Sequence, residues 1–223
     1  MLSDVTDIIF DLDGTLIDSS KGIFSAFSLA ASLSDLPTPT FRHFSSLIGP
    51  PIRDIIRLIY PKLDPSISEK FVSNFRHFYD SQCYTSFSVY PNVQSSLHKL
   101  AVSGFRIYVV TNKPTAPACT ILSSLNLINL FGAVIGIDYP CSLSRPPFAS
   151  KSEALSFLLT KYSLINSSCL YVGDTFKDYE SCKSLCLPFI GASYGFYDWS
   201  SLDNISVPLI SDIYQLQAYL TTN

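Results

Sequence analysis

The chain has 223 residues, 47% of them hydrophobic, and a formal net charge of -3 at pH 7. This length and apolar content suffice for the buried core of one large domain, or of a domain with a small insert. The charge leaves no basic surface that would favour nucleic acid. The longest apolar runs have the length of strands, so we expect no membrane span.

The six cysteines are scattered and include no Cys-x-x-Cys pair, which argues against a cysteine-based metal site. Scattered thiols fit a reducing compartment. The N-terminus carries neither the basic segment nor the long apolar run of a secretory signal. We therefore expect a cytoplasmic protein.

The first predicted element is an apolar strand that ends at Phe10 and is followed by Asp11-Leu12-Asp13-Gly14-Thr15. A strand with this ending presents both carboxylates at its C-terminal edge. There they can hold Mg²⁺, which prefers one or two carboxylates with phosphate oxygens and waters. One of them can also attack an electrophile and so divide a hard displacement into two easier ones. The motif indicates Mg²⁺-assisted phosphoryl transfer through an aspartyl-phosphate, although Asp-Gly-Thr is also ordinary turn sequence.

The pattern is helical from Lys21 to about Gln82, with no convincing core strand. Apolar residues recur at helical spacing after Lys21, again over 52–59, and once more after Ser66 or Ser68, either of which can cap the third helix. We therefore expect a small all-helical domain at 19–87, inserted into a core domain formed by residues 1–18 and 88–223.

Strands and helices alternate in the rest of the chain. Strands are predicted at 105–110, 133–137, 169–172, 188–190 and 207–210, and helices at 91–102, 116–125, 151–161, 177–185 and 213–219. Such alternation predicts an α/β fold, a doubly wound (Rossmann-like) parallel sheet covered on both faces. Ligands bind beyond the carboxyl ends of the strands in such a sheet, and polar residues directly follow three of the predicted strands: Asp11 and Asp13, Thr111 and Asn112, and Asp174.

Thr111 and Lys151 are candidates for binding phosphate. A hydroxyl with a neighbouring backbone N–H at a strand end can hold phosphate oxygens, although Thr and Asn are also favoured helix N-caps. Lys151 opens a predicted helix, and a helix N-terminus itself favours an anion. Arg145, in a Pro-rich loop, is the competing cation; Lys151 is preferred because it starts a helix and Arg145 does not.

Asp174 can complete a metal site with the Asp11 carboxylate and the main-chain carbonyl of Asp13. Asp178 lies four positions further on, in the first helical turn, and points the same way. It is better placed to support the metal ligands than to bind the metal. A simpler interpretation is that Asp178 complements the helix dipole.

Four segments, in this order, resemble the haloacid dehalogenase-like hydrolase superfamily over nearly the whole chain: Asp11 through Ser19, Thr111-Asn112-Lys113, Lys151, and Gly173 through Asp178. Segments 47–52, 151–155 and 191–195 resemble the phosphoglycolate phosphatase and 5′-nucleotidase-like subgroup, which carries a small helical cap. The chain departs from the pattern at 185–188, where a Gly is usual, and at 140–147, which is rich in Pro and Ser.

The resemblance implies that Asp11 is the nucleophile. Asp13 is then the general acid that protonates the leaving group and afterwards the base that activates water. Thr111 and Lys151 bind the transferring phosphoryl group, and Asn112 supports it. Mg²⁺ is held by Asp11, Asp13 and Asp174.

Two further residues follow from the same resemblance. Gly14 shapes the turn after the nucleophile and belongs to the substrate-binding loop. Arg53, in the cap segment, is a candidate contact for a substrate carboxylate or a second phosphate. The cap would select the substrate by closing over the site.

We therefore expect a Mg²⁺-dependent phosphomonoester hydrolase that acts on a small phosphorylated metabolite and resembles phosphoglycolate phosphatase. A 5′-nucleotidase acting on nucleoside monophosphates and a sugar phosphomutase are the alternatives on the same scaffold. A catalytically silent binding protein is the alternative from a different class. The expected partner is a small phosphomonoester, with no nucleic acid and no membrane.

Overall fold

The computed structural model describes residues 4–48, 50–139, 148–201 and 206–220. The chain divides into two compact units: residues 1–17 with 89–223, here called the sheet unit, and residues 18–88, here called the helical unit. The chain passes twice between the two units, and each of these boundaries lies one residue from the one expected from the sequence. β2 (Ile17–Asp18) and β3 (Ser88–Val89) lie at these two points and pair with each other as a two-stranded sheet.

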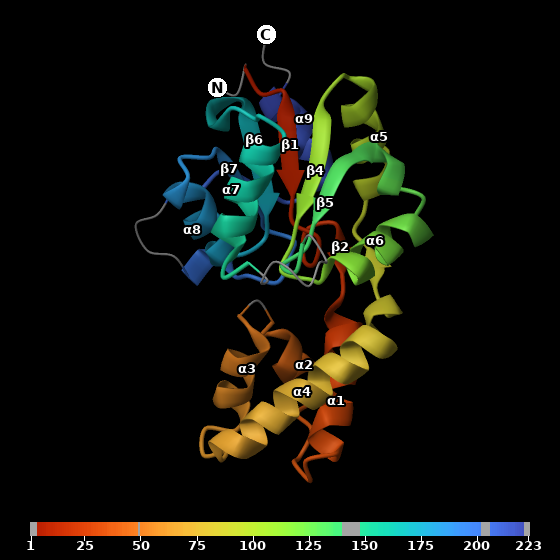
Figure 1. Cartoon of the computed structure of the whole chain (residues 1–223), viewed down its shortest axis with the longest axis vertical. Coiled ribbons are helices and arrows are strands. Elements are labelled where there is room, and N and C mark those ends of the chain that lie inside the picture. The colour runs from red at the N-terminus through yellow and green to blue at the C-terminus, as the bar shows by residue number, and fades with distance from the viewer. Residues whose placement is uncertain (1–3, 49, 140–147, 202–205, 221–223) are drawn as a thin grey trace. The chain divides into compact units, whose positions relative to one another are not determined.

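The sheet unit is built on a six-stranded sheet with the order β5-β4-β1-β6-β7-β8 (Figure 1). Every neighbouring pair is parallel. This arrangement confirms the predicted α/β fold. The strands are β1 (Asp7–Phe10), β4 (Arg106–Val110), β5 (Phe131–Ile135), β6 (Cys169–Gly173), β7 (Phe189–Ala192) and β8 (Leu209–Ile210).

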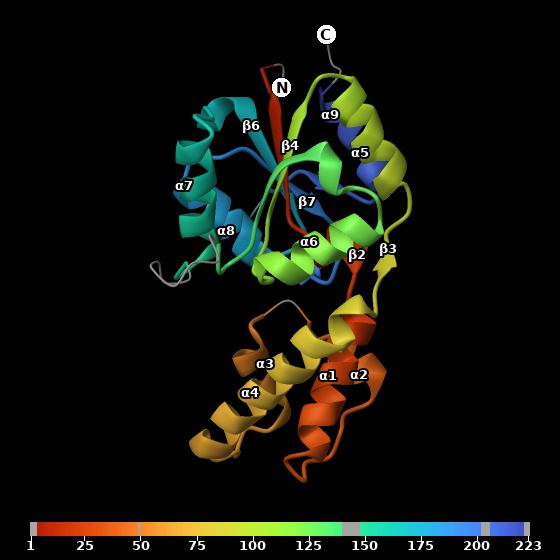
Figure 2. The ribbon, with the colours of Figure 1, turned by 45° about the vertical axis from the view of Figure 1, so that its right-hand side comes forward.

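Helices cover both faces of this sheet. α7 (Lys151–Lys161) and α8 (Phe176–Ser184) lie on one face, and α5 (Val93–Val102) and α9 (Leu216–Leu220) lie on the other (Figure 1 and Figure 2). α6 (Thr115–Ser124) connects β4 to β5. All four residues of β1 and all five of β6 are buried. Central strands covered on both sides need largely apolar sequence. These two strands have it apart from Asp7, and this is why they could be recognised.

β5 lies two residues earlier than predicted, because the apolar run through Ile137 continues after the strand has ended. The amide of Gly136 donates to the Thr115 hydroxyl at 3.2 Å instead of continuing the ladder. A Cβ at Gly136 would come within 2.6 Å of the Lys113 carbonyl oxygen. Gly136 therefore lets the end of β5 approach the loop that follows β4.

The helical unit contains α1 (Ser20–Ser32), α2 (Phe41–Ser45), α3 (Ile52–Ile59) and α4 (Pro65–Ser81). Aromatic rings form its core: Phe27 lies with its centroid 4.7 Å from that of Phe44 and 4.9 Å from that of Phe71. Burial of such rings is a major source of stability in a small unit. Phe44 and Phe71 have no exposed surface, so they serve packing.

The N-cap of α4 is Asp64, and the prediction of Ser66 or Ser68 was wrong. The Asp64 carboxylate accepts a hydrogen bond from the Ser66 amide at 2.8 Å. Pro65 occupies the first helical turn, where its missing N–H costs nothing and its fixed φ suits the helix. Among the described helices of both units, none combines the length and the apolar character that a bilayer crossing requires.

Candidate active site

The sequence motifs meet at the carboxyl edge of the sheet because β1 lies between β4 and β6. Phe10 is in register with Val109 on one side and with Val172 on the other. The chain places β4 and β5 on one side of β1 and β6 to β8 on the other, so its order reverses at β1. Parallel sheets bind ligands at such a point.

Three carboxylates from two of these motifs form a buried cluster. Asp11, Asp174 and Asp178 are at most 5% exposed, and one oxygen of each lies within 4.8 Å of the others. The Asp13 carboxylate is not part of this cluster. Such closely spaced buried carboxylates need compensating positive charge.

Lys151 supplies part of this charge. Its Nζ lies 3.0 Å from Asp11 Oδ1 and donates a hydrogen bond to Asp178 Oδ1, and its side chain is 8% exposed. The start of α7 is fixed by Ser150, whose Oγ accepts from the Glu153 amide. Lys151 therefore joins the motif after β1 to the motif after β6.

Asp178 is held by a capping box at the start of α8. Its Oδ2 accepts from the amide and the hydroxyl of Thr175, at 3.0 and 2.6 Å, while the Thr175 hydroxyl oxygen accepts from the Asp178 amide. Its Oδ1 accepts from Lys151 and, at 3.4 Å, from the Tyr171 hydroxyl. With donors on both oxygens, Asp178 is suited to positioning Lys151.

Asp174 is held by groups from two turns. The Thr15 hydroxyl donates to its Oδ1 at 3.3 Å, and the Phe196 amide donates to its Oδ2 at 2.9 Å. The Tyr194 hydroxyl donates to the Thr15 carbonyl at 2.9 Å. The segment after β7 therefore braces both Asp174 and the turn that follows Asp11, a role that the sequence motif at 191–195 did not indicate.

Gly14 leaves the space that the Asp174 carboxylate occupies. Gly14 has φ +86°, and a Cβ there would lie 2.1 Å from Asp174 Oδ2. We expect Gly14→Ala to lower the free energy of unfolding by about 3 kcal/mol or more, since it combines left-handed backbone strain with a steric clash. Gly104→Ala is the matched control, because Gly104 has φ +89° and nothing within 4 Å of its Cβ position.

Gly104→Ala should lower the free energy of unfolding only through its left-handed backbone, by about 1 to 2 kcal/mol. Urea unfolding of both variants measures the difference. Equal losses in the two variants would show that the contact between Gly14 and Asp174 is not tight.

Thr111 and Asn112 lie in the loop between β4 and α6. Thr111 is buried, its Oγ1 accepts from the Lys113 amide at 3.1 Å, and its own amide donates to the Ile135 carbonyl. Asn112 is exposed. The N-cap of α6 is Pro114, so neither Thr111 nor Asn112 caps this helix. No bond donated by the Thr111 hydroxyl is found among the described residues, so its proton can serve a ligand.

Lys113 was not predicted to have a role of its own. Its side chain is 2% exposed, and its Nζ lies 3.1 Å from Asp13 Oδ1. No sequence pattern marks a lysine in a loop as buried, because most lysines are on the surface. The close approach of the β4 and β1 loops is what brings this ion pair about.

The electrostatics of the site favour a cation. Four carboxylates (Asp11, Asp13, Asp174 and Asp178) face two ammonium groups (Lys113 and Lys151) among the described residues, so the site would carry two negative charges if all four carboxylates were ionised. Burial raises the pKa of Asp11 to about 7 although Lys151 acts in the opposite direction. Burial also raises the pKa of Asp174 well above its ordinary range.

Two predicted residues are not placed in this constellation. Arg53 belongs to the helical unit, where α3 presents it to Glu69 of α4 as an ion pair. Arg145 lies outside the described residues.

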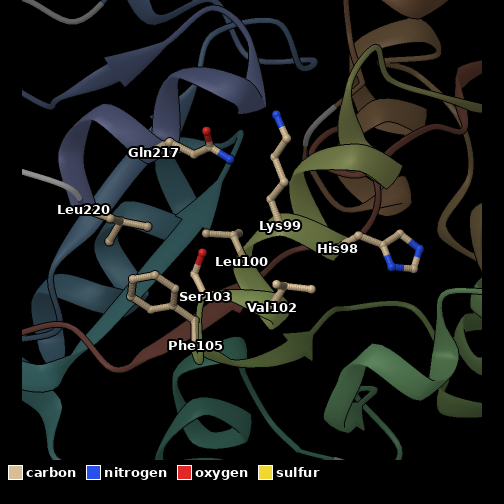
Figure 3. A pocket seen from close by; sticks show the side chains of 8 residues that line it. All are labelled: His98, Lys99, Leu100, Val102, Ser103, Phe105, Gln217 and Leu220. Carbon is tan, nitrogen blue, oxygen red and sulfur yellow. The ribbon is translucent and has the colours of Figure 1, made fainter.

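A hollow lined by Lys99, Leu100, Gln217 and Leu220 lies between α5 and α9 (Figure 3), and none of its lining residues belongs to the sequence motifs.

Comparison with known proteins identifies the family of this chain. The sequence model of the haloacid dehalogenase-like hydrolase family matches residues 8–192. Phosphoglycolate phosphatase from Yersinia pseudotuberculosis is 29% identical over 196 residues, covering 86% of this chain and 82% of the relative. Phosphoglycolate phosphatase from Vibrio cholerae is 29% identical over 213 residues, covering 92% of this chain and 92% of the relative.

Solved structures show the same fold. A haloacid dehalogenase-like family hydrolase from Streptococcus pneumoniae superimposes with a TM-score of 0.85 at 24% identity, covering 97% of this chain and 98% of that one. The family match spans the strand ends that carry Asp11, Thr111 and Asp174. The chain therefore belongs to the haloacid dehalogenase-like hydrolase family.

Proposed function

We propose that this protein is a Mg²⁺-dependent phosphomonoester hydrolase that forms an aspartyl-phosphate on Asp11. The observation that carries the proposal is the position of Lys151, which lies between the Asp11 carboxylate and Asp178 beside the buried Asp174. A nucleophilic carboxylate, a fixed cation and a set of further carboxylates at one sheet edge are the components that phosphoryl transfer needs.

In the first step an Asp11 oxygen attacks phosphorus and the ester P–O bond breaks. Asp13 donates its proton to the departing alcohol oxygen. In the second step Asp13 takes a proton from water, the oxygen of that water attacks phosphorus, and the bond to Asp11 breaks. Inorganic phosphate leaves, and Asp11 is restored as a carboxylate.

Lys151 and Thr111 bind the equatorial oxygens of the transferring group in this proposal, and Asn112 supports it. Lys151 is fixed by Asp178 before substrate arrives, so its charge needs no reorganisation during the reaction. Gly14 keeps the turn after the nucleophile in the left-handed conformation that allows Asp174 to lie against it.

The carboxylates fit a divalent cation. Asp11 and Asp174 would hold Mg²⁺ together with the Asp13 main-chain carbonyl, and the ion would neutralise charge between Asp11 and an incoming phosphate. Asp11 Oδ1 is buried, and the Lys151 ammonium that lies 3.0 Å away uses only part of what a carboxylate oxygen can accept. It therefore retains acceptor capacity that a cation can use.

Proton binding gives a test of the metal site that does not depend on turnover. Asp11 has a pKa of 3.8 when unperturbed and about 7 in the metal-free fold. In this interval the folded protein holds a proton that the unfolded chain has released. The free energy of unfolding of the metal-free protein should therefore fall as the pH rises from 3.8 through about 7.

Mg²⁺ competes with that proton, so its stabilising effect should grow as the pH rises through the same interval. Thermal unfolding with EDTA and with Mg²⁺, at pH values across and above the interval, measures two slopes: the stability of the metal-free protein against pH, and the stabilisation by Mg²⁺ against pH. Asp11→Asn should make both slopes shallower, with the contribution of Asp174 remaining, and should raise the melting temperature of the EDTA-treated protein. A Mg²⁺ effect that is the same at every pH, or unchanged in Asp11→Asn, would refute the assignment.

For the substrate we propose a small phosphorylated metabolite of the phosphoglycolate type. The relatives named phosphoglycolate phosphatase support this choice, since they align with 86% and 92% of this chain. We further propose that residues 18–88 act as a cap that selects the substrate, with Arg53 as a contact for its carboxylate.

Phosphate release from a panel of phosphomonoesters, with Mg²⁺ and with EDTA, tests the proposed function. The panel contains phosphoglycolate, nucleoside monophosphates and sugar phosphates. Metal-dependent release that is fastest for phosphoglycolate is the expected result. Preference for nucleotides would reassign the substrate, and no release from any ester would contradict the hydrolase.

A further inference from the structure

Lys113 is a second buried lysine at the site, and the proposed chemistry gives it no role. It follows Thr111-Asn112 in the loop after β4, and its side chain is 2% exposed. Burying an ammonium group is costly unless a partner of opposite charge is close. That partner is the Asp13 carboxylate, whose Oδ1 lies 3.1 Å from Lys113 Nζ.

The backbone of Lys113 is fixed on both sides. Its amide donates to Thr111 Oγ1 at 3.1 Å, and its carbonyl accepts from the Ile137 amide at 3.3 Å. Gly136 allows this approach, since a Cβ there would lie 2.6 Å from the Lys113 carbonyl oxygen. Lys113 is therefore built into the loop rather than free to leave its partner for solvent.

The ion pair is not aligned as a hydrogen bond. Asp13 Oδ1 is buried and accepts no hydrogen bond within the described part of the chain. Lys113 thus holds the Asp13 carboxylate through charge, and Asp13 Oδ1 can still accept a hydrogen bond from another donor. At 21% exposure the Asp13 side chain can still be reached from outside.

We propose that Lys113 is a positioning residue for Asp13, which holds the carboxylate in the orientation that serves the leaving group. The proposal rests on the proposed function, since it assumes that Asp13 protonates the departing alcohol. Through its amide Lys113 also orients the Thr111 hydroxyl, so the same residue aligns a phosphoryl contact and the acid.

Comparing kcat/KM for esters with different leaving groups separates the proposed role of Lys113 from a purely structural one, which would affect all esters alike. An alkoxide needs a proton as it departs, whereas p-nitrophenolate is stable enough to leave without one. kcat/KM reports the steps up to the first irreversible one, here the transfer to Asp11, and so isolates the step in which Asp13 is the acid. A misplaced Asp13 should therefore damage alkyl esters selectively.

Lys113→Met should lower kcat/KM for an alkyl phosphate, such as glycerol phosphate or phosphoglycolate, by about 10- to 100-fold, and for p-nitrophenyl phosphate by about threefold or less. Asp13→Asn should show the same selectivity more strongly. In the double variant, Lys113→Met should lower kcat/KM for the alkyl phosphate little beyond the loss that Asp13→Asn causes alone, because the two residues act as a unit. Lys151→Met is the contrast, since a phosphoryl contact should affect both esters alike.

Lys113→Gln, neutral and polar, is the second variant if Lys113→Met does not fold. Equal losses on the two esters, or no loss on either, would overturn the role of Lys113 while leaving the hydrolase intact. A wild-type protein that hydrolyses neither ester would instead overturn the proposed function, so the two failures are distinguishable.

Discussion

Asp11→Asn is expected to lower kcat for phosphate release by at least about a thousandfold, because an amide cannot serve as the nucleophile and the steps that depend on it fail together. The substitution preserves shape, and Asp11 lies in a buried position where its charge is costly. The variant should therefore fold at least as well as the metal-free wild type. Steady-state kinetics with Mg²⁺, together with thermal unfolding, measures both effects.

Asp7→Asn is the matched control. Asp7 is the first residue of β1, whereas Asp11 directly follows the last. Asp7 is 1% exposed and pairs with Arg106 through both carboxylate oxygens. Its replacement should cost about 1 to 3 kcal/mol of stability and leave kcat nearly unchanged. If both variants keep activity, or if both lose it equally, Asp11 is not the nucleophile.

Lys151→Met is expected to lower kcat/KM by about 100- to 1000-fold, the range found when one preorganised stabilising group is removed. The change retains most of the buried length but leaves Asp11 and Asp178 without their shared cation. The loss should appear for good and poor leaving groups alike, because the phosphoryl oxygens carry charge in both reactions.

Lys161→Met controls for the loss of a lysine from the same helix, since Lys161 is exposed at the other end of α7. Arg145→Met tests the competing cation. Loss of activity in Lys151→Met alone is the predicted pattern. A mild effect in Lys151→Met together with a severe one in Arg145→Met would move the phosphoryl-binding role to Arg145.

The parts of the fold that could be predicted depend on short stretches of sequence. Apart from Asp7, the central strands β1 and β6 are apolar runs, since both faces of the sheet are covered. The polar residues that follow them must then meet at one edge, so Asp11, Thr111 and Asp174 could be grouped before their positions were known. Lys151 could be singled out because it opens a helix.

The contacts that could not be predicted join residues far apart in the chain. The Phe196 amide reaches Asp174, and Tyr194 reaches the Thr15 carbonyl, through a turn whose sequence gives no sign of either bond. The Lys113 and Asp13 pair likewise depends on how two loops approach each other. Asp178 was expected either to support the metal ligands or to complement the helix dipole; in the structure it closes a capping box at the start of α8 and accepts from Lys151.

The phosphoryl group on Asp11 is the central claim, and trapping it is the most direct measurement. The wild-type protein is mixed with a phosphomonoester and Mg²⁺, quenched in acid and reduced with borohydride, and its peptides are analysed by mass spectrometry. Borohydride converts an aspartyl-phosphate to homoserine, so the account predicts homoserine at position 11, dependent on both Mg²⁺ and substrate. Turnover with an unmodified Asp11, or modification of a different residue, would contradict it.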